Sequence, residues 1–179
     1  MSGGSGEGLK RRDSGSDIFF VCTTNANPSR RIDAMFEMLV KLDIGYYTFH
    51  DRDVSPEGNT IEESNKMLDE IVDYLEAKQK ETGVKLLWST QNLFTHERYM
   101  NGGGTNPDAK VFAYACAQAK KVLEINHRLG GENVVFWGGR EGYQSVLNTN
   151  IKREIDHMAA FFKVSRGGRR GGRSWRQGR

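Results

Sequence analysis

The feature that most constrains the fold is an alternation of short apolar runs with longer amphipathic segments. Three runs have the length and composition of strands, at about 44–50, 84–90 and 133–137. Segments with apolar residues at helical spacing begin near four capping sequences, at Asn27-Pro28, Thr60, Asn106-Pro107-Asp108 and Asn150. This order predicts an α/β fold with parallel strands and right-handed crossovers, either a doubly wound sheet or part of a (β/α)8 barrel.

Polar sequence follows each predicted strand. HDRD occupies 50–53, STQN occupies 89–92 and WGGRE occupies 137–141. In both architectures the carboxyl ends of the strands meet at one rim, where binding groups collect. The sequence therefore predicts a site built from these three segments.

The alternation of side chains along a strand predicts which residues share a face. It groups His50 with Thr48 and Tyr46, Thr90 with Trp88 and Leu86, and Trp137 with Val135 and Asn133. Facing one interior, these sets would supply an apolar wall with an imidazole and a hydroxyl, which suits a small polar ligand with ring carbons, such as a sugar. The alternative, from spacing alone, is that the two tryptophans are simply large core residues.

The two ends of the chain differ from its middle. Residues 1–17 and 164–179 contain few apolar side chains and are predicted to be disordered, which leaves 18–163 as the folded domain. Segment 164–179 carries six Arg and no acid, so its positive charge exceeds the net charge of +3 of the whole chain. The remainder is therefore mildly acidic, and the basic balance does not indicate a nucleic-acid-binding domain.

Cysteine content and hydropathy exclude some classes of protein. Cys22 and Cys116 are far apart and show no metal-binding spacing, which argues against a disulfide framework and a zinc site. The apolar run IFFVC at 18–22 is too short to span a membrane. We expect a cytoplasmic protein with no membrane association.

Several ordered motifs resemble one enzyme family. FHDRD at 49–53, LLWST at 86–90, NLFTH at 92–96, RYM at 98–100 and VFWGGREGY at 135–143 are similar to segments of xylose isomerase, in the class with the longer N-terminal region. The run ENVVFWGGREGYQSVLNT and the spacing between the motifs match as well. The resemblance covers roughly residues 30–163.

The resemblance implies a partial (β/α)8 TIM barrel, about three parallel βα units, in an enzyme that interconverts D-xylose and D-xylulose. The reaction would be a hydride shift assisted by divalent metals, Mg²⁺, Mn²⁺ or Co²⁺, in a dimer or tetramer. His50 would bind the ring end of the sugar and assist ring opening, and Asp53 would fix its tautomer. Asp51 and Arg52 would be structural. The matching pocket-wall positions are Trp88, Thr90, Phe94, Val135 and Trp137.

The sequence departs from the family at both ends. The family continues after 163 into a strand with Glu-Pro-Lys, where its metal ligands begin, whereas this chain continues as VSRGGRRGGR. Glu-Pro-Lys occurs nowhere in the chain, so no metal ligand is assigned. SGSDIFFVCTTNAN stands in place of the first barrel strand, and IFFVC is a candidate substitute.

These departures predict a truncated family member that is weakly active or inactive alone. A sheet with one bare face should self-associate or bind a full-length xylose isomerase subunit. The alternative is a non-catalytic protein that keeps part of the sugar pocket or interacts with another subunit. Nucleic-acid binding through the Arg/Gly segment is less favoured, because about 16 residues without a folded RNA module are a weak signal.

Overall fold

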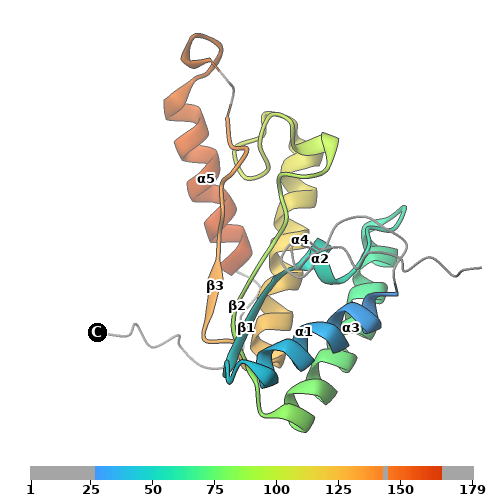
Figure 1. Ribbon diagram of the computed structural model, residues 1–179. Coiled ribbons are helices and arrows are strands. Elements are labelled where there is room, and N and C mark those ends of the chain that lie inside the picture. Colours follow the sequence, from blue (N-terminus) through green and yellow to red (C-terminus); the bar gives the residue numbers. More distant parts are fainter. Residues whose placement is uncertain (1–26, 143–144, 167–179) are drawn as a thin grey trace, which may run out of the picture.

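The computed structural model describes residues 27–142 and 145–166, in which strands and helices alternate as the sequence predicts (Figure 1). The strands are β1 (Tyr46–His50), β2 (Lys85–Thr90) and β3 (Asn133–Val135). The α-helices are α1 (Pro28–Lys41), α2 (Asp51–Val54), α3 (Ile61–Thr82), α4 (Ala109–Arg128) and α5 (Ile151–Arg166). Two short 3₁₀ helices are η2 (Glu97–Tyr99) and η3 (Val146–Asn148).

Local capping explains where the long helices begin and end. The Asn27 side chain accepts a hydrogen bond from Ser29 N ahead of α1, and the Thr60 hydroxyl accepts one from Glu63 N ahead of α3. Gly83 ends α3 with φ of 77°, a left-handed conformation that glycine adopts without strain. These contacts confirm the boundaries predicted for the two helices.

The three strands form a parallel sheet in the order β1-β2-β3. One face of the sheet is covered by α1, α3 and α4 (Figure 1). The core beneath these helices joins residues from both layers: Ile32, Phe36, Leu39, Tyr47, Phe49, Val54, Leu68, Val72, Leu75, Val84, Leu86, Ile125 and Leu129. The fold is an open three-stranded α/β sheet, consistent with part of a (β/α)8 barrel.

The opposite face of the sheet carries side chains that are less buried. Tyr46 is 42% exposed, and Thr48 and Trp88 are partly buried. Two of the strand residues predicted for the open face, Tyr46 and Trp88, are thus outside the helix-covered core.

The position of Leu86 differs from the prediction. Between Tyr47 and Thr48 the register advances by one residue on β2, as in a β-bulge, so Tyr47 pairs with Leu86 while Thr48 pairs with Trp88. Leu86 is 0% exposed and lies in the core with Tyr47. Strict alternation placed Leu86 beside Trp88 on the open face, and this was wrong because the extra residue reverses the order of the faces.

The carboxyl-terminal part of the described chain packs as a second cluster. Helix α5 packs against α4 (Figure 1). Phe161 of α5 is buried in a cluster with Ala115 and Ala119 of α4, and its ring meets that of Phe136 edge-on. β3 ends at Val135 rather than continuing to residue 137 as predicted, and Phe136 packs against this cluster. Helix α5 continues to Arg166, three residues beyond the predicted end of the domain at 163.

Some predictions fall outside the described residues. These are the disordered segment 1–17, the candidate strand IFFVC at 18–22 and most of the Arg/Gly segment, from 167 onward. No helix within 27–142 or 145–166 combines the length and hydropathy needed to cross a membrane.

Truncation of Leu86 tests the register shift. We expect Leu86→Ala to lower the free energy of unfolding by about 2–5 kcal/mol, because the change removes buried methyl groups from a packed core. Leu42→Ala, at a side chain that is 60% exposed, is the control and should have a much smaller effect. The measurement is equilibrium urea unfolding, and similar small losses for both variants would contradict this assignment of Leu86.

Candidate functional site

The histidine and aspartate singled out by the sequence form a hydrogen-bonded pair at the end of β1. His50 is the last residue of β1, and its extended backbone (φ −94°, ψ 145°) leads directly into α2. One helical turn brings Asp53 back toward it, with Nδ1 of His50 2.6 Å from Oδ2 of Asp53. The short helix α2 supplies the i, i+3 spacing that makes this contact.

The pair fixes the chemical character of the imidazole. A carboxylate only accepts hydrogen bonds, so the shared hydrogen belongs to Nδ1 of His50. In the neutral imidazole, Nε2 then carries a lone pair that can accept a hydrogen bond or a proton. Both side chains are partly exposed, at 30% for His50 and 28% for Asp53.

Aromatic rings from three segments gather beside His50. The ring of Trp88, from β2, lies 6.4 Å from the imidazole between centroids, and that of Phe94 lies 5.6 Å away with an interplanar angle of 81°. Phe94 in turn meets Trp137 edge-on, at 4.5 Å and 85°. Trp137 is 52% exposed. The rings of Trp88, Phe94 and Trp137 form an aromatic wall beside a polar pair. This arrangement suits a ligand with both hydroxyl groups and apolar ring carbons.

Two residues predicted for the pocket wall have contacts of another kind. Thr90 is 1% exposed, and its hydroxyl donates to the backbone oxygen of Val135 at 2.5 Å. This bond ties β2 to β3 next to the ladder pair Thr90–Val135. The structure thus brings His50, Asp53 and the three aromatic rings together, while the hydroxyl of Thr90 is engaged within the sheet.

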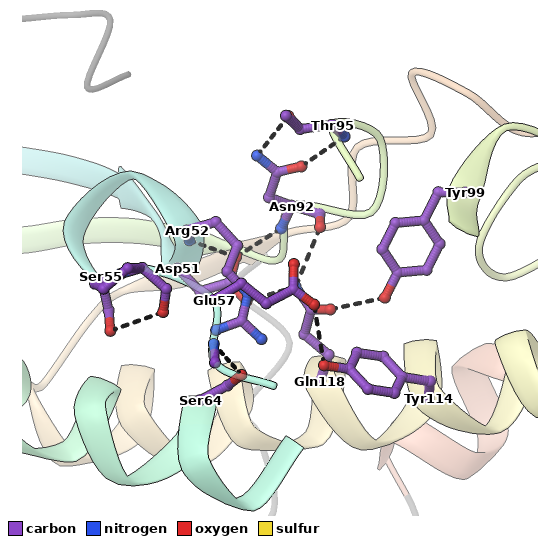
Figure 2. Close-up of polar contacts among 12 residues, drawn as sticks. Asp51, Arg52, Ser55, Glu57, Ser64, Asn92, Thr95, Tyr99, Tyr114 and Gln118 are labelled. Atoms are coloured by element: carbon purple, nitrogen blue, oxygen red, sulfur yellow. Dashed lines mark hydrogen bonds and ion pairs between the residues drawn. The ribbon is translucent and has the colours of Figure 1, made fainter. Parts of the chain in front are cut away.

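A buried carboxylate lies directly behind the histidine. Asp51 is 1% exposed and accepts hydrogen bonds from Asn92 N at 2.8 Å, Arg52 N at 2.9 Å and Gln118 Nε2 at 2.7 Å (Figure 2). Burial raises the pKa of the Asp51 carboxyl above its usual value, against the opposing effects of the Arg52 charge and the hydrogen bonds. The prediction that Asp51 and Arg52 are structural and pair with neighbouring segments is confirmed for Asp51.

Sequence reasoning missed Asn92 and Gln118 as partners of this carboxylate. A signal for Gln118 was present, because it is a polar residue at helical spacing within the buried face of α4, beside Ala115 and Val122. Asn92 was noted only as the last residue of the polar run after β2. Its role depends on where the chain turns, which the run itself does not specify.

Glu57, Arg98 and Tyr114 form a second polar contact that closes the rim on the side of α4. Glu57 Oε1 is 2.7 Å from Nη1 of Arg98. It also accepts a hydrogen bond from the hydroxyl of Tyr114 at 3.1 Å (Figure 2). The guanidinium of Arg98 also stacks on the ring of Tyr114, 4.0 Å from its centroid. These contacts join the loop after α2 to η2 and α4.

Glu141, to which the sequence assigned no role, holds the loop after η2. Its carboxylate accepts hydrogen bonds from the backbone nitrogens of Gly103, Gly104 and Thr105, at 2.9–3.2 Å. Gly102 has φ of 91°, and a Cβ there would lie 2.6 Å from Glu141 Oε2, so this position requires glycine. The carboxylate thus acts as a clamp on the loop.

A metal centre needs several ligating side chains close together. Within the described part of the chain, no group of three or more His, Cys, Asp or Glu side chains is arranged to hold a metal ion. The acids nearest the histidine, Asp51 and Asp53, are engaged with backbone amides, Gln118 and the imidazole. These residues do not fit a divalent metal centre.

The raised pKa of Asp51 predicts a pH-dependent stability. Because the folded state holds this proton more tightly than the unfolded chain, the stabilisation it brings is fully present below about pH 3.8 and is lost as the pH rises through the raised pKa. Asp51→Asn has no carboxyl to titrate there. We expect the free energy of unfolding of the wild type, relative to this variant, to fall with increasing pH across that window. Urea unfolding at a series of pH values measures the difference, and a difference that stays constant or rises would contradict the assignment.

The amino-acid sequence of the chain is similar to those of several known proteins. No family model matches the chain. It is 58% identical over 136 residues to the xylose isomerase of Lactococcus lactis subsp. cremoris (strain SK11), which covers 76% of this chain and 35% of that protein. It is 54% identical over 136 residues to the xylose isomerase of Arabidopsis thaliana, covering 76% and 28%. It is 50% identical over 162 residues to that of Rhodopirellula baltica, covering 90% and 36%. The chain spans about a third of the length of these curated relatives.

Proposed function

We propose that this chain, which belongs to the xylose isomerase family, binds D-xylose or a related aldose at the rim of its sheet. The observation that supports this best is the 2.6 Å contact between His50 and Asp53 beside an aromatic wall. A pyranose has hydroxyl groups for the imidazole and apolar ring faces for the aromatic side chains. The reaction to which the segment would contribute is aldose–ketose isomerisation.

The imidazole is suited to the opening of the sugar ring. Nε2 of His50 can take the proton of the anomeric hydroxyl as the carbonyl forms at C1 and the bond from C1 to the ring oxygen breaks. The electron pair of that bond goes to the ring oxygen, which takes a proton back from the imidazolium. Asp53 stabilises the transient positive charge and keeps the ring in the tautomer that leaves Nε2 unprotonated.

The isomerisation step itself calls for groups beyond this pair. In the proposed family reaction, divalent metals supply the polarisation of the substrate oxygens. The described residues do not fit such a centre, so no step through a metal is assigned to them. This observation favours a second candidate function, a sugar-binding segment that is non-catalytic by itself.

Binding of D-xylose to the purified chain tests the sugar site. We expect saturable binding that is weakened about tenfold by His50→Asn and by Asp53→Asn, because each change removes a hydrogen-bonding group that orients or meets the sugar. Saturation-transfer and chemical-shift NMR titrations measure the affinity. His127→Asn, at an exposed position of α4, is the matched histidine control and should bind like the wild type.

Two outcomes separate the candidate functions. Wild-type affinity in both site variants would dismiss the pair as a sugar site. An assay for D-xylulose with Mg²⁺, Mn²⁺ or Co²⁺ addresses catalysis, and turnover at an ordinary rate by this chain alone would dismiss the non-catalytic candidate.

The open face of the sheet supports a proposal about assembly. Tyr46 and Trp137 are large side chains that remain about half exposed on this side of the molecule. We expect the chain to associate with itself or with a longer xylose isomerase subunit, because covering the face would bury these side chains. Light scattering coupled to size-exclusion chromatography, alone and with a xylose isomerase subunit, measures this association. A concentration-independent monomer that binds no subunit would contradict it.

A further inference from the structure

The ends of β1 and β2 are joined by one side chain beyond the last pair of the sheet ladder. The ladder ends where His50 pairs with Thr90. Oδ1 of Asp51, the residue after His50, accepts a hydrogen bond from the backbone nitrogen of Asn92 at 2.8 Å. Asn92 lies two residues after Thr90. The carboxylate of Asp51 therefore links the two chain segments just beyond the last backbone pair of the ladder, beside the proposed sugar site.

Asn92 passes this constraint on to the aromatic wall. Its side-chain oxygen accepts hydrogen bonds from Phe94 N at 3.3 Å and Thr95 N at 3.0 Å, and its Nδ2 donates to the Thr95 hydroxyl at 2.9 Å. The residue is 7% exposed, so these bonds form largely out of contact with water. They set the turn that aims the Phe94 ring at the imidazole of His50, 5.6 Å away.

Gln118 holds the two residues together from the helix layer. Its Nε2 donates both to Oδ2 of Asp51 at 2.7 Å and to the backbone oxygen of Asn92 at 3.1 Å (Figure 2). Its Oε1 accepts the hydroxyl of Tyr99 at 2.8 Å, which orients the amide. Asp51, Asn92 and Tyr99 are all buried. The hydrogen bonds of the Gln118 amide therefore all lie behind the proposed site.

We propose that Asp51 and Asn92 are positioning residues of the sugar site, which set the placement of Phe94 against His50. The proposal rests on the proposed function for its ligand, and on the contacts above for its geometry. Neither residue touches the sugar. They act by fixing the distance between the imidazole at the end of β1 and the ring that follows β2.

Removal of the Asn92 side chain is the direct test, in the full chain of 179 residues. Asn92→Ala should move the imidazole ¹H–¹³C resonances of His50, because these lie in the ring-current field of Phe94. It should also weaken D-xylose binding by on the order of tenfold. Asn92→Asp keeps the oxygen that accepts from Phe94 N and Thr95 N, and should retain most of both properties.

Two further variants complete the test, one as a control away from the site and one as a smaller change within it. Asn150→Ala removes an asparagine that accepts from Arg153 N at the start of α5, away from the site, and should leave the His50 resonances and the sugar affinity unchanged. Thr95→Val, at an exposed side chain, removes only the acceptor for Asn92 Nδ2 and should give a smaller shift in the same direction as Asn92→Ala. Thr95→Val keeps the test decisive if Asn92→Ala does not fold.

The outcomes separate this proposal from the proposed function. Lower thermal stability of Asn92→Ala with unchanged His50 resonances would overturn the positioning role, since a purely structural residue would behave in that way. If the wild-type chain binds no D-xylose, the proposed function fails, and the His50 resonances still decide whether Asn92 places Phe94. Moved resonances with wild-type sugar affinity would overturn the part of the proposal that concerns the sugar.

Discussion

The buried carboxylate of Asp51 is the interaction on which the rim of the sheet depends. A charged group away from water is costly unless each of its oxygens is bonded, and here donors come from α2, the loop after β2 and α4. The three segments must therefore stay together for the group to remain buried. These bonds join the segments that carry His50 and Phe94, whose rings lie 5.6 Å apart between centroids.

The sequence predicts the elements that local chemistry decides. Asn27-Pro28, Thr60 and Gly83 mark helix ends because the capping bonds and the left-handed turn involve only neighbouring residues. The contact between His50 and Asp53 is local in the same sense, since the two residues are three apart. The parallel order of the strands also follows, because each long helix must cross from one end of the sheet to the other.

Other features depend on tertiary contacts that a pattern does not contain. Alternation predicts the face of Leu86 only while every residue of β2 has a partner, and the register shift at Leu87 removes that condition. β3 ends at Val135, and the next residue, Phe136, packs against side chains of α4 and α5 that are distant in the sequence. Gln118 lies 67 residues from its carboxylate partner, and only the packing of α4 on the sheet makes them neighbours.

The register shift also gives the two halves of β2 different surroundings. Before Leu87, β2 contributes Leu86 to the core, and after it Trp88 belongs to the aromatic wall. Leu86 and Trp88 would share one face of a regular strand, and the inserted residue lets β2 present one of them to the helix layer and the other to the open face.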